Sequence, residues 1–260
     1  MFLLHGFLDT GDTFQFLADA FEADLPLVAP DWRGFGRSAW PQDGYWFPDY
    51  IADLDALLEV YSPGQPVRLV GHSMGGNIAS LYAGIRPERV RSMVNLEGFG
   101  LPRTSPEHTA SHVRRWLEHV RETPSLPTYD SFEQLADRIR HRYPRVPPGR
   151  ALRIARSWGR RRADGRIHLR VDPRHKRINA VPYRRDEAEA CWAKIRAPML
   201  MVFGELSEFA HQLGPDGTQE HFQALIPGMT AHQLPGTGHM MHLECPELLA
   251  PLIERFLGEH

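Results

Sequence analysis

Short, nearly continuous hydrophobic runs recur along the chain, each bounded by glycine, proline or charged residues. Because the runs lack regular polar alternation, they predict parallel strands that are covered on both faces. They lie at residues 2–6, 26–31, 67–73, 92–97, 198–203 and 231–235.

Helical patterns lie between these runs. The last of them opens with Pro246, a residue that suits the first turn of a helix. Strands alternating with helices predict an α/β fold, a doubly wound and mostly parallel sheet. The predicted helices span residues 13–21, 48–61, 74–85, 219–225 and 246–257.

The alternation stops between Leu101 and Pro198, where prolines are frequent and helical stretches appear at residues 112–121, 132–141 and 150–158. The simplest interpretation is a helical cap inserted between two strands of one sheet. We therefore predict a core formed by residues 1–100 and 197–260 and an arginine-rich cap formed by residues 101–196.

Charge divides the chain in the same way. The net charge of the 260 residues is −2, but residues 101–196 hold 23 of the 30 Lys+Arg and 11 of the 32 Asp+Glu, which gives +12 there and −14 elsewhere. The cap arginines are expected either to pair with the acidic core or to attract an anionic substrate or surface. We find no recognised nucleic-acid-binding module and expect no nucleic-acid partner.

The composition is that of an ordinary globular protein. The two cysteines provide no disulfide framework and fit a reducing compartment, so we expect a cytoplasmic protein. No signal peptide is apparent at the start of the sequence. No run reaches the ~18 apolar residues that a membrane-spanning helix needs, so no membrane span is expected.

The segment Gly71-His72-Ser73-Met74-Gly75 connects a predicted strand directly to a predicted helix. Glycines two positions on either side of a serine permit the sharp turn called a nucleophile elbow. Ser73 is therefore the candidate nucleophile, exposed at the positive end of a helix.

Three other segments accompany this elbow: residues 1–7 ending in His5-Gly6-Phe7, residues 30–38, and Gly238-His239. With the elbow they resemble the α/β-hydrolase superfamily, in the branch that carries a helical cap. The resemblance covers about two thirds of the chain. It implies hydrolysis of a small ester-like molecule without a cofactor, and a serine in the elbow argues against relatives that use aspartate there.

The resemblance also implies roles for further residues. His239, in a glycine-rich loop after the last strand, is the expected general base. The backbone N–H groups of Phe7 and Met74 are expected to form the oxyanion hole. His242 makes an H-x-x-H pair with His239, a spacing that occurs in metal sites. No further acidic or cysteine ligand stands at a spacing typical of a metal site, so we expect none.

The third member of a catalytic triad, the acid that orients the histidine, has several candidates, since the position where much of the family carries aspartate is Ser207. We favour Glu97, which ends the strand after the nucleophile strand, as some family members place it. The alternatives are Glu205 and Glu208, which flank Ser207. A further alternative is that Glu97 is only a charged residue at the solvated end of a strand and has no catalytic role.

The family sheet usually has two more strands before the one that ends in His5-Gly6. The sequence starts within that later strand, so the N-terminal strands are expected to be missing, either trimmed or preceding a misplaced start. An uncovered apolar edge strand is an aggregation hazard, which favours the misplaced start.

The sequence thus predicts a serine hydrolase that cleaves a carboxylic ester or related acyl bond through an acyl-enzyme. Hydrolysis of a carbon–carbon bond in a diketone is the enzymatic alternative. A ligand-binding sensor without catalytic activity is the alternative of another class, because the usual aspartate is absent.

Overall fold

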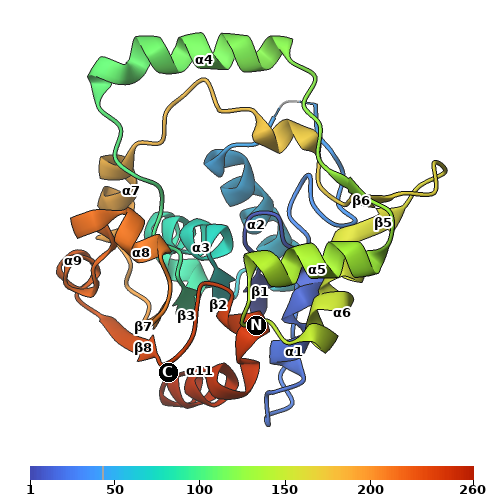
Figure 1. Cartoon of the computed structure of the whole chain (residues 1–260). Coiled ribbons are helices and arrows are strands. Elements are labelled where there is room, and N and C mark those ends of the chain that lie inside the picture. Colours follow the sequence, from blue (N-terminus) through green and yellow to red (C-terminus); the bar gives the residue numbers. More distant parts are fainter. Residues whose placement is uncertain (43) are drawn as a thin grey trace.

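The computed structural model describes residues 1–42 and 44–260 and contains a five-stranded parallel sheet in the order β1-β2-β3-β7-β8 (Figure 1). Every adjacent pair of strands in it is parallel, as predicted. The strands span Phe2–Leu4 (β1), Val67–His72 (β2), Val90–Leu96 (β3), Met199–Gly204 (β7) and Met229–Leu234 (β8).

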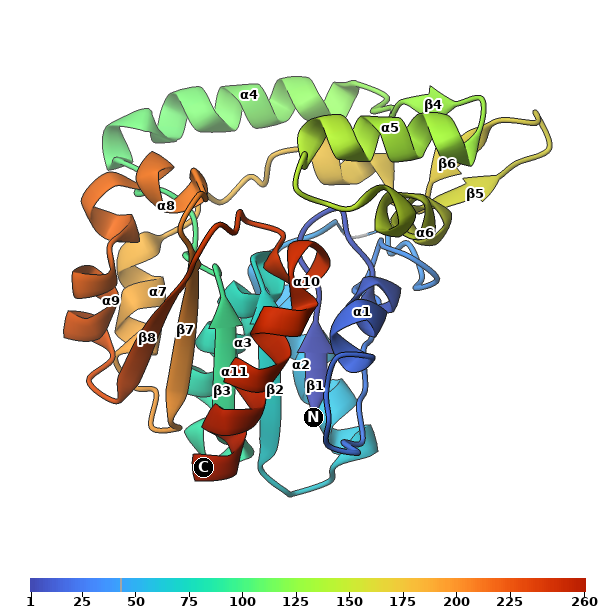
Figure 2. The ribbon, with the colours of Figure 1, turned by 60° about the horizontal axis from the view of Figure 1, so that its bottom comes forward.

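Helices cover both faces of this sheet (Figure 2). Because successive side chains of a strand point to opposite faces, alternate residues of each strand enter different cores. Phe2 and Leu4 point to one core, and Leu3 between them points to the other. The helices of the first core are α2 (Phe47–Tyr61), α3 (Met74–Ile85), α7 (Arg185–Trp192) and α9 (Gln219–Leu225). Those of the second are α1 (Gln15–Ala18) and α11 (Pro246–Glu259).

The predicted strand at residues 26–31 is wrong. Only Val28 makes a parallel bridge, to Phe2, with its N–H donating to the Met1 carbonyl and its carbonyl accepting from Leu3. Pro26 and Pro30 lack the N–H groups that a longer ladder needs, which accounts for the short pairing. The bridge nevertheless covers part of the outer edge of β1.

The predicted helix at residues 13–21 is shorter than expected, a 3₁₀ turn at Gly11–Phe14 followed by α1. The predictions for α2, α3, α9 and α11 agree with the structure to within two residues. The remaining short elements are α8 (Phe209–Gln212), α10 (Met241–Glu244) and 3₁₀ turns at Pro87–Arg89, Pro106–His108, Pro173–Lys176 and Gly214–Gly217.

The inserted segment lies over the carboxyl ends of the core strands (Figure 2). Its helices are α4 (Thr109–Arg121), α5 (Phe132–Arg142) and α6 (Pro148–Trp158). It also contains an antiparallel sheet, which the sequence analysis did not predict, of β4 (Thr128–Tyr129), β6 (Ile167–Leu169) and β5 (Gly159–Arg161). The signal was Asp164-Gly165, a hairpin turn in which Gly165 has φ +78°.

Helix α7 falls within residues 101–196 but packs against core helix α3. A Cβ on Gly84 of α3 would come within 1.9 Å of the Cys191 carbonyl oxygen, so the two backbones are in close contact. Trp192 is buried in the core beside them. The domain division remains a prediction, and α7 indicates that its second boundary lies earlier than residue 196.

Candidate active site

Ser73 occupies a sharp turn between β2 and α3. Its φ of 52° and ψ of −115° are unusual for a residue with a side chain, and such strain is typical of a nucleophile elbow. A Cβ on Gly71 would lie 2.6 Å from the Gly75 carbonyl oxygen, and one on Gly75 would lie 2.1 Å from that of Leu4. Both positions therefore require glycine, as the sequence indicated.

Glu97 directly follows β3 and also has a left-handed backbone, with φ 56°. Its carboxylate is fully buried, and each oxygen has a donor. Oε1 accepts a hydrogen bond from the Gly204 N–H at 2.7 Å, and Oε2 accepts one from the Ser207 hydroxyl at 2.6 Å. The same Oε2 lies 2.7 Å from Nδ1 of His239, so the acid and the imidazole form a direct pair.

His239 lies in the loop between β8 and α10, with 10% of its side chain exposed. Its ring stacks on Phe209 at a centroid distance of 3.8 Å. Its carbonyl oxygen lies 2.8 Å from Nε2 of His72, the residue before Ser73. Packing and hydrogen bonding therefore orient the imidazole, and the contact of Nδ1 with Glu97 leaves Nε2 available for proton transfer.

The alternative acids lie elsewhere. Glu205 is exposed, and its Oε2 accepts a hydrogen bond from the Gly236 N–H at 2.7 Å. Glu208 is also exposed and precedes α8. In the described part of the chain, the carboxylate that contacts His239 is that of Glu97.

The turn after β1 brings Phe7 towards the elbow. A Cβ on Gly6 would lie 3.1 Å from Cβ of Ser73 and 2.8 Å from Nδ1 of His72, so the two turns are in close contact. Among backbone hydrogen bonds of the described residues, neither the Phe7 nor the Met74 N–H has a carbonyl partner. Both groups are thus available to an oxygen near Ser73.

Asp9 is a buried residue beside this turn that the sequence analysis missed. Its Oδ1 accepts hydrogen bonds from the Thr10 N–H at 2.8 Å, the Thr13 hydroxyl at 2.8 Å and the Trp158 indole N–H of the cap at 2.7 Å. Its Oδ2 lies 3.1 Å from Nε2 of His242. An aspartate in a loop of polar residues gives no sequence signal that it will be buried.

Burial acts to raise the pKa of Asp9. The hydrogen bonds from His242 and Trp158 and the electrostatic effect of His242 and His5 outweigh burial, so the pKa of Asp9 is lowered. Asp9 is therefore ionised at neutral pH. It connects the turn that carries Phe7 to the cap through Trp158 and, through His242, to α10, the helix that follows the loop of His239.

His72 lies between this cluster and His239. Its ring centroid is 4.3 Å from that of His242 and 4.7 Å from that of His239. Burial, followed by the neighbouring His242 and His239, lowers the pKa of His72 well below its usual value. The ring is therefore neutral at physiological pH.

Among the described residues, two groups of side chains bring atoms that could bind a metal ion within 4.8 Å of one another. The first, Asp9 with His72 and His242, is buried. In this group, Nε2 of His242 and Oδ2 of Asp9 form a hydrogen bond with each other. Among the described residues, Nδ1 of His72 and Nδ1 of His242 are buried without a hydrogen-bond partner, so hydrogen bonding engages only part of this group.

The second group, Glu189 with Asp216 and His221, lies beside two arginines. Arg103 contacts both carboxylates, at 2.6 Å to Glu189 and 2.8 Å to Asp216, and Arg185 lies 2.8 Å from Glu189. The guanidinium groups balance the acidic charge, so this group is an ion-pair network.

The arrangement of fold and site has a counterpart in known proteins. Residues 1–246 match the family model described as alpha/beta hydrolase fold, and the chain belongs to that family. No helix among the described residues is long and apolar enough to cross a membrane.

The chain is similar to a "Serine hydrolase-like protein" of Danio rerio, with 26% identity over 98% of this chain and 80% of the relative. It is also similar to a "2-(acetamidomethylene)succinate hydrolase" of Mesorhizobium japonicum, with 25% identity over 99% of this chain and 87% of the relative. A solved structure of a hypothetical protein of Pseudomonas aeruginosa superposes with a TM-score of 0.86 at 23% identity, covering 99% and 90% of the two chains. Family and relatives support a hydrolase activity without specifying the substrate class.

Proposed function

We propose that this hydrolase cleaves a carboxylic ester of a small molecule through a covalent acyl-enzyme, with Ser73, His239 and Glu97 as its triad. The observation that carries the proposal is the 2.7 Å contact between Glu97 Oε2 and His239 Nδ1, made by a fully buried carboxylate. A buried carboxylate in this place orients the imidazole and stabilises its cation.

The chemistry follows from these contacts. Nε2 of His239 takes the proton of the Ser73 hydroxyl as its oxygen attacks the ester carbonyl. The Phe7 and Met74 N–H groups donate hydrogen bonds to the oxyanion, a contribution worth about 2.7–4 kcal/mol of barrier for one such donor. His239 then protonates the departing alcohol. A water molecule, deprotonated by His239, releases the acid and restores the serine.

We favour an enzyme over a ligand-binding sensor without catalytic activity. The sensor hypothesis rested on the absent aspartate at Ser207, and the contact of Glu97 with His239 supplies a carboxylate by another route. No contact in the site favours carbon–carbon bond hydrolysis.

Labelling with a fluorophosphonate probe, together with turnover of p-nitrophenyl esters of graded acyl length, tests the proposal. The expected result is covalent labelling and ester turnover that are both lost in Ser73→Ala. A chain that is folded by circular dichroism but is neither labelled nor active on any ester would refute it.

A further inference from the structure

A cavity region lies apart from the triad, where the cap meets the core. One cavity of about 420 Å³ is bounded by residues that follow β1, by the loop around Gly36, and by cap helix α6 with Arg170. An adjoining cavity, also about 420 Å³, shares Gly36, Arg37 and Arg170 and adds Trp40 and Arg160. We call the two together the seam cleft. Ser73, Glu97 and His239 do not line it.

Five arginines line the seam cleft, and no lysine does. Among the described residues, none of the five has a carboxylate oxygen within 4.0 Å, whereas nine other arginines of the chain do. The five are Arg37, Arg153, Arg156, Arg160 and Arg170.

Among the described residues, the carboxylates of Asp12 and Asp31 line the cleft and offset only part of the charge of its five arginines. The two oxygens of Asp31 accept hydrogen bonds from the backbone N–H groups of Gly11 and Arg37, both at 2.8 Å. Burial and the nearby charges of Arg162 and Arg170 lower the pKa of Arg160, as expected where like charges gather.

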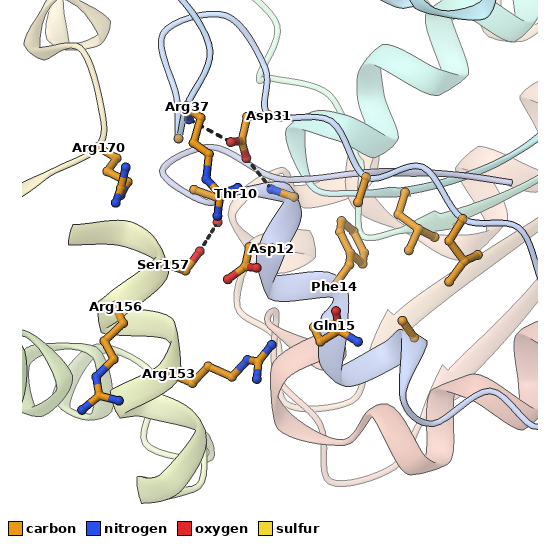
Figure 3. A pocket seen from close by; sticks show the side chains of 16 residues that line it. Thr10, Asp12, Phe14, Gln15, Asp31, Arg37, Arg153, Arg156, Ser157 and Arg170 are labelled. Atoms are coloured by element: carbon orange, nitrogen blue, oxygen red, sulfur yellow. Dashed lines mark hydrogen bonds between the residues drawn. The ribbon is translucent and has the colours of Figure 1, made fainter. Parts of the chain in front are cut away.

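Figure 3 shows how the side chains are arranged. Arg37 from the core and Arg170 from the cap extend from opposite sides towards the level of Ser157. Arg153 reaches from α6 towards Gln15 of α1. The cleft is therefore bounded by cationic groups from both parts of the chain.

We propose that the seam cleft binds a small molecule carrying a diphosphate or an equivalent pair of phosphate groups, held by Arg37, Arg153 and Arg170. The planar guanidinium group matches phosphate oxygens through paired hydrogen bonds, and several unneutralised arginines favour a ligand of more than one negative charge. The volume is that of an ordinary small-molecule site.

Binding here would join the cap to the core. The two walls already meet at the hydrogen bond between the Thr10 and Ser157 hydroxyls, 2.6 Å long. Thr10 adjoins Asp9, which contacts the cap and lies beside the turn that carries Phe7. A bound dianion would strengthen this closure by linking Arg37 of the core to Arg153 and Arg170 of the cap.

The binding experiment does not depend on the proposed ester activity. Calorimetric titration of the whole chain with pyrophosphate, and separately with ADP, at low ionic strength is expected to show binding that weakens with added salt. In Arg37→Gln/Arg153→Gln the dissociation constant should rise at least tenfold. Arg114→Gln/Arg115→Gln removes two exposed charges from α4 of the same cap and should leave it unchanged.

Equal affinities in wild type and Arg37→Gln/Arg153→Gln, or no binding at millimolar pyrophosphate, would overturn the proposal. Unchanged melting temperatures would show that the exposed substitutions leave the fold intact. The source of the phosphates is decided by kinetics with acetyl-coenzyme A and an acetyl thioester without phosphates. A preference for the former that is lost in the variant identifies the substrate's own carrier, and pyrophosphate binding without such a preference identifies a separate ligand.

Discussion

The hydroxyl of Ser207 donates a hydrogen bond to Glu97 Oε2 over 2.6 Å, and that oxygen also contacts His239 Nδ1 at 2.7 Å. Ser207 stands where much of the family carries its acid. In the proposed triad the acid is Glu97 at the end of β3, and Ser207 donates its hydrogen bond to that carboxylate. The proposed acid is thus in contact with the residue at the family's usual position.

The first prediction concerns the acid. Glu97→Gln should lower kcat for ester hydrolysis by about 10²–10⁴, because a neutral amide cannot stabilise the imidazolium. KM should change little. Steady-state kinetics on a p-nitrophenyl ester checks this, with Glu205→Gln as the matched control that keeps its activity. Near-full activity of Glu97→Gln would remove Glu97 from the triad.

The second prediction concerns Ser207. In Ser207→Asp a second carboxylate would face Glu97 in a buried site, and two like charges at such a distance cannot both ionise without cost. We expect kcat to fall at least tenfold, and Ser207→Ala to lose only a few-fold. If Ser207→Asp were as active as the wild type, the aspartate would be acting as the acid at the family's usual place.

The third prediction concerns the turn that carries Phe7. In Gly6→Ala the new methyl group would lie 2.8 Å from His72 Nδ1 and 3.1 Å from Ser73 Cβ, so the turn must shift. Loss of one oxyanion donor lowers kcat by about 10²–10³, and a loss approaching this range is expected. Gly149→Ala, where a Cβ meets nothing within 4 Å, is the control. Equal kcat in the two variants would argue against a role of the Phe7 N–H.

The fourth prediction concerns Asp9. Asp9→Asn removes the buried carboxylate charge that contacts Trp158 and His242, and should lower the free energy of unfolding by about 3 kcal/mol. Asp12→Asn, at an exposed position nearby, should change it by less than about 0.5 kcal/mol. Urea denaturation measures both. Equal stabilities would mean that the contacts of Asp9 do not hold the cap and core together.

The fifth prediction concerns pH. The ring of His175 stacks between those of Phe35 and Tyr45, at centroid distances of 4.1 Å and 3.7 Å. Burial lowers the pKa of His175 from 6.5 to about 4. Between these values the unfolded chain binds more protons than the folded one, so stability falls as the pH drops through this window. The effect of this residue is at most about 3 kcal/mol.

His175→Phe keeps an aromatic ring in the stack and removes the titrating group. Its free energy of unfolding should therefore depend less on pH between 6.5 and 4 than that of the wild type. Urea denaturation at several pH values compares the two. Parallel curves would show that His175 does not titrate in this way.

The sequence by itself determined the parts that depend on neighbouring residues. The elbow was predictable because Gly71 and Gly75 are needed within five residues of one another, and α3 was predicted at its observed limits. Uninterrupted apolar runs likewise indicated a sheet buried on both faces. A strand whose side chains enter a core on each face needs apolar residues at successive positions.

Only the tertiary structure decided the contacts between distant residues. The pairing of Glu97 with His239 joins positions 142 apart in sequence, and the sequence favoured Glu97 but left Glu205 and Glu208 open as alternatives. Asp9 and the cap strands were missed because burial of a loop carboxylate and pairing of short strands depend on what packs against them. Local sequence sets backbone preference, whereas these features arise from packing between segments that the chain brings together only on folding.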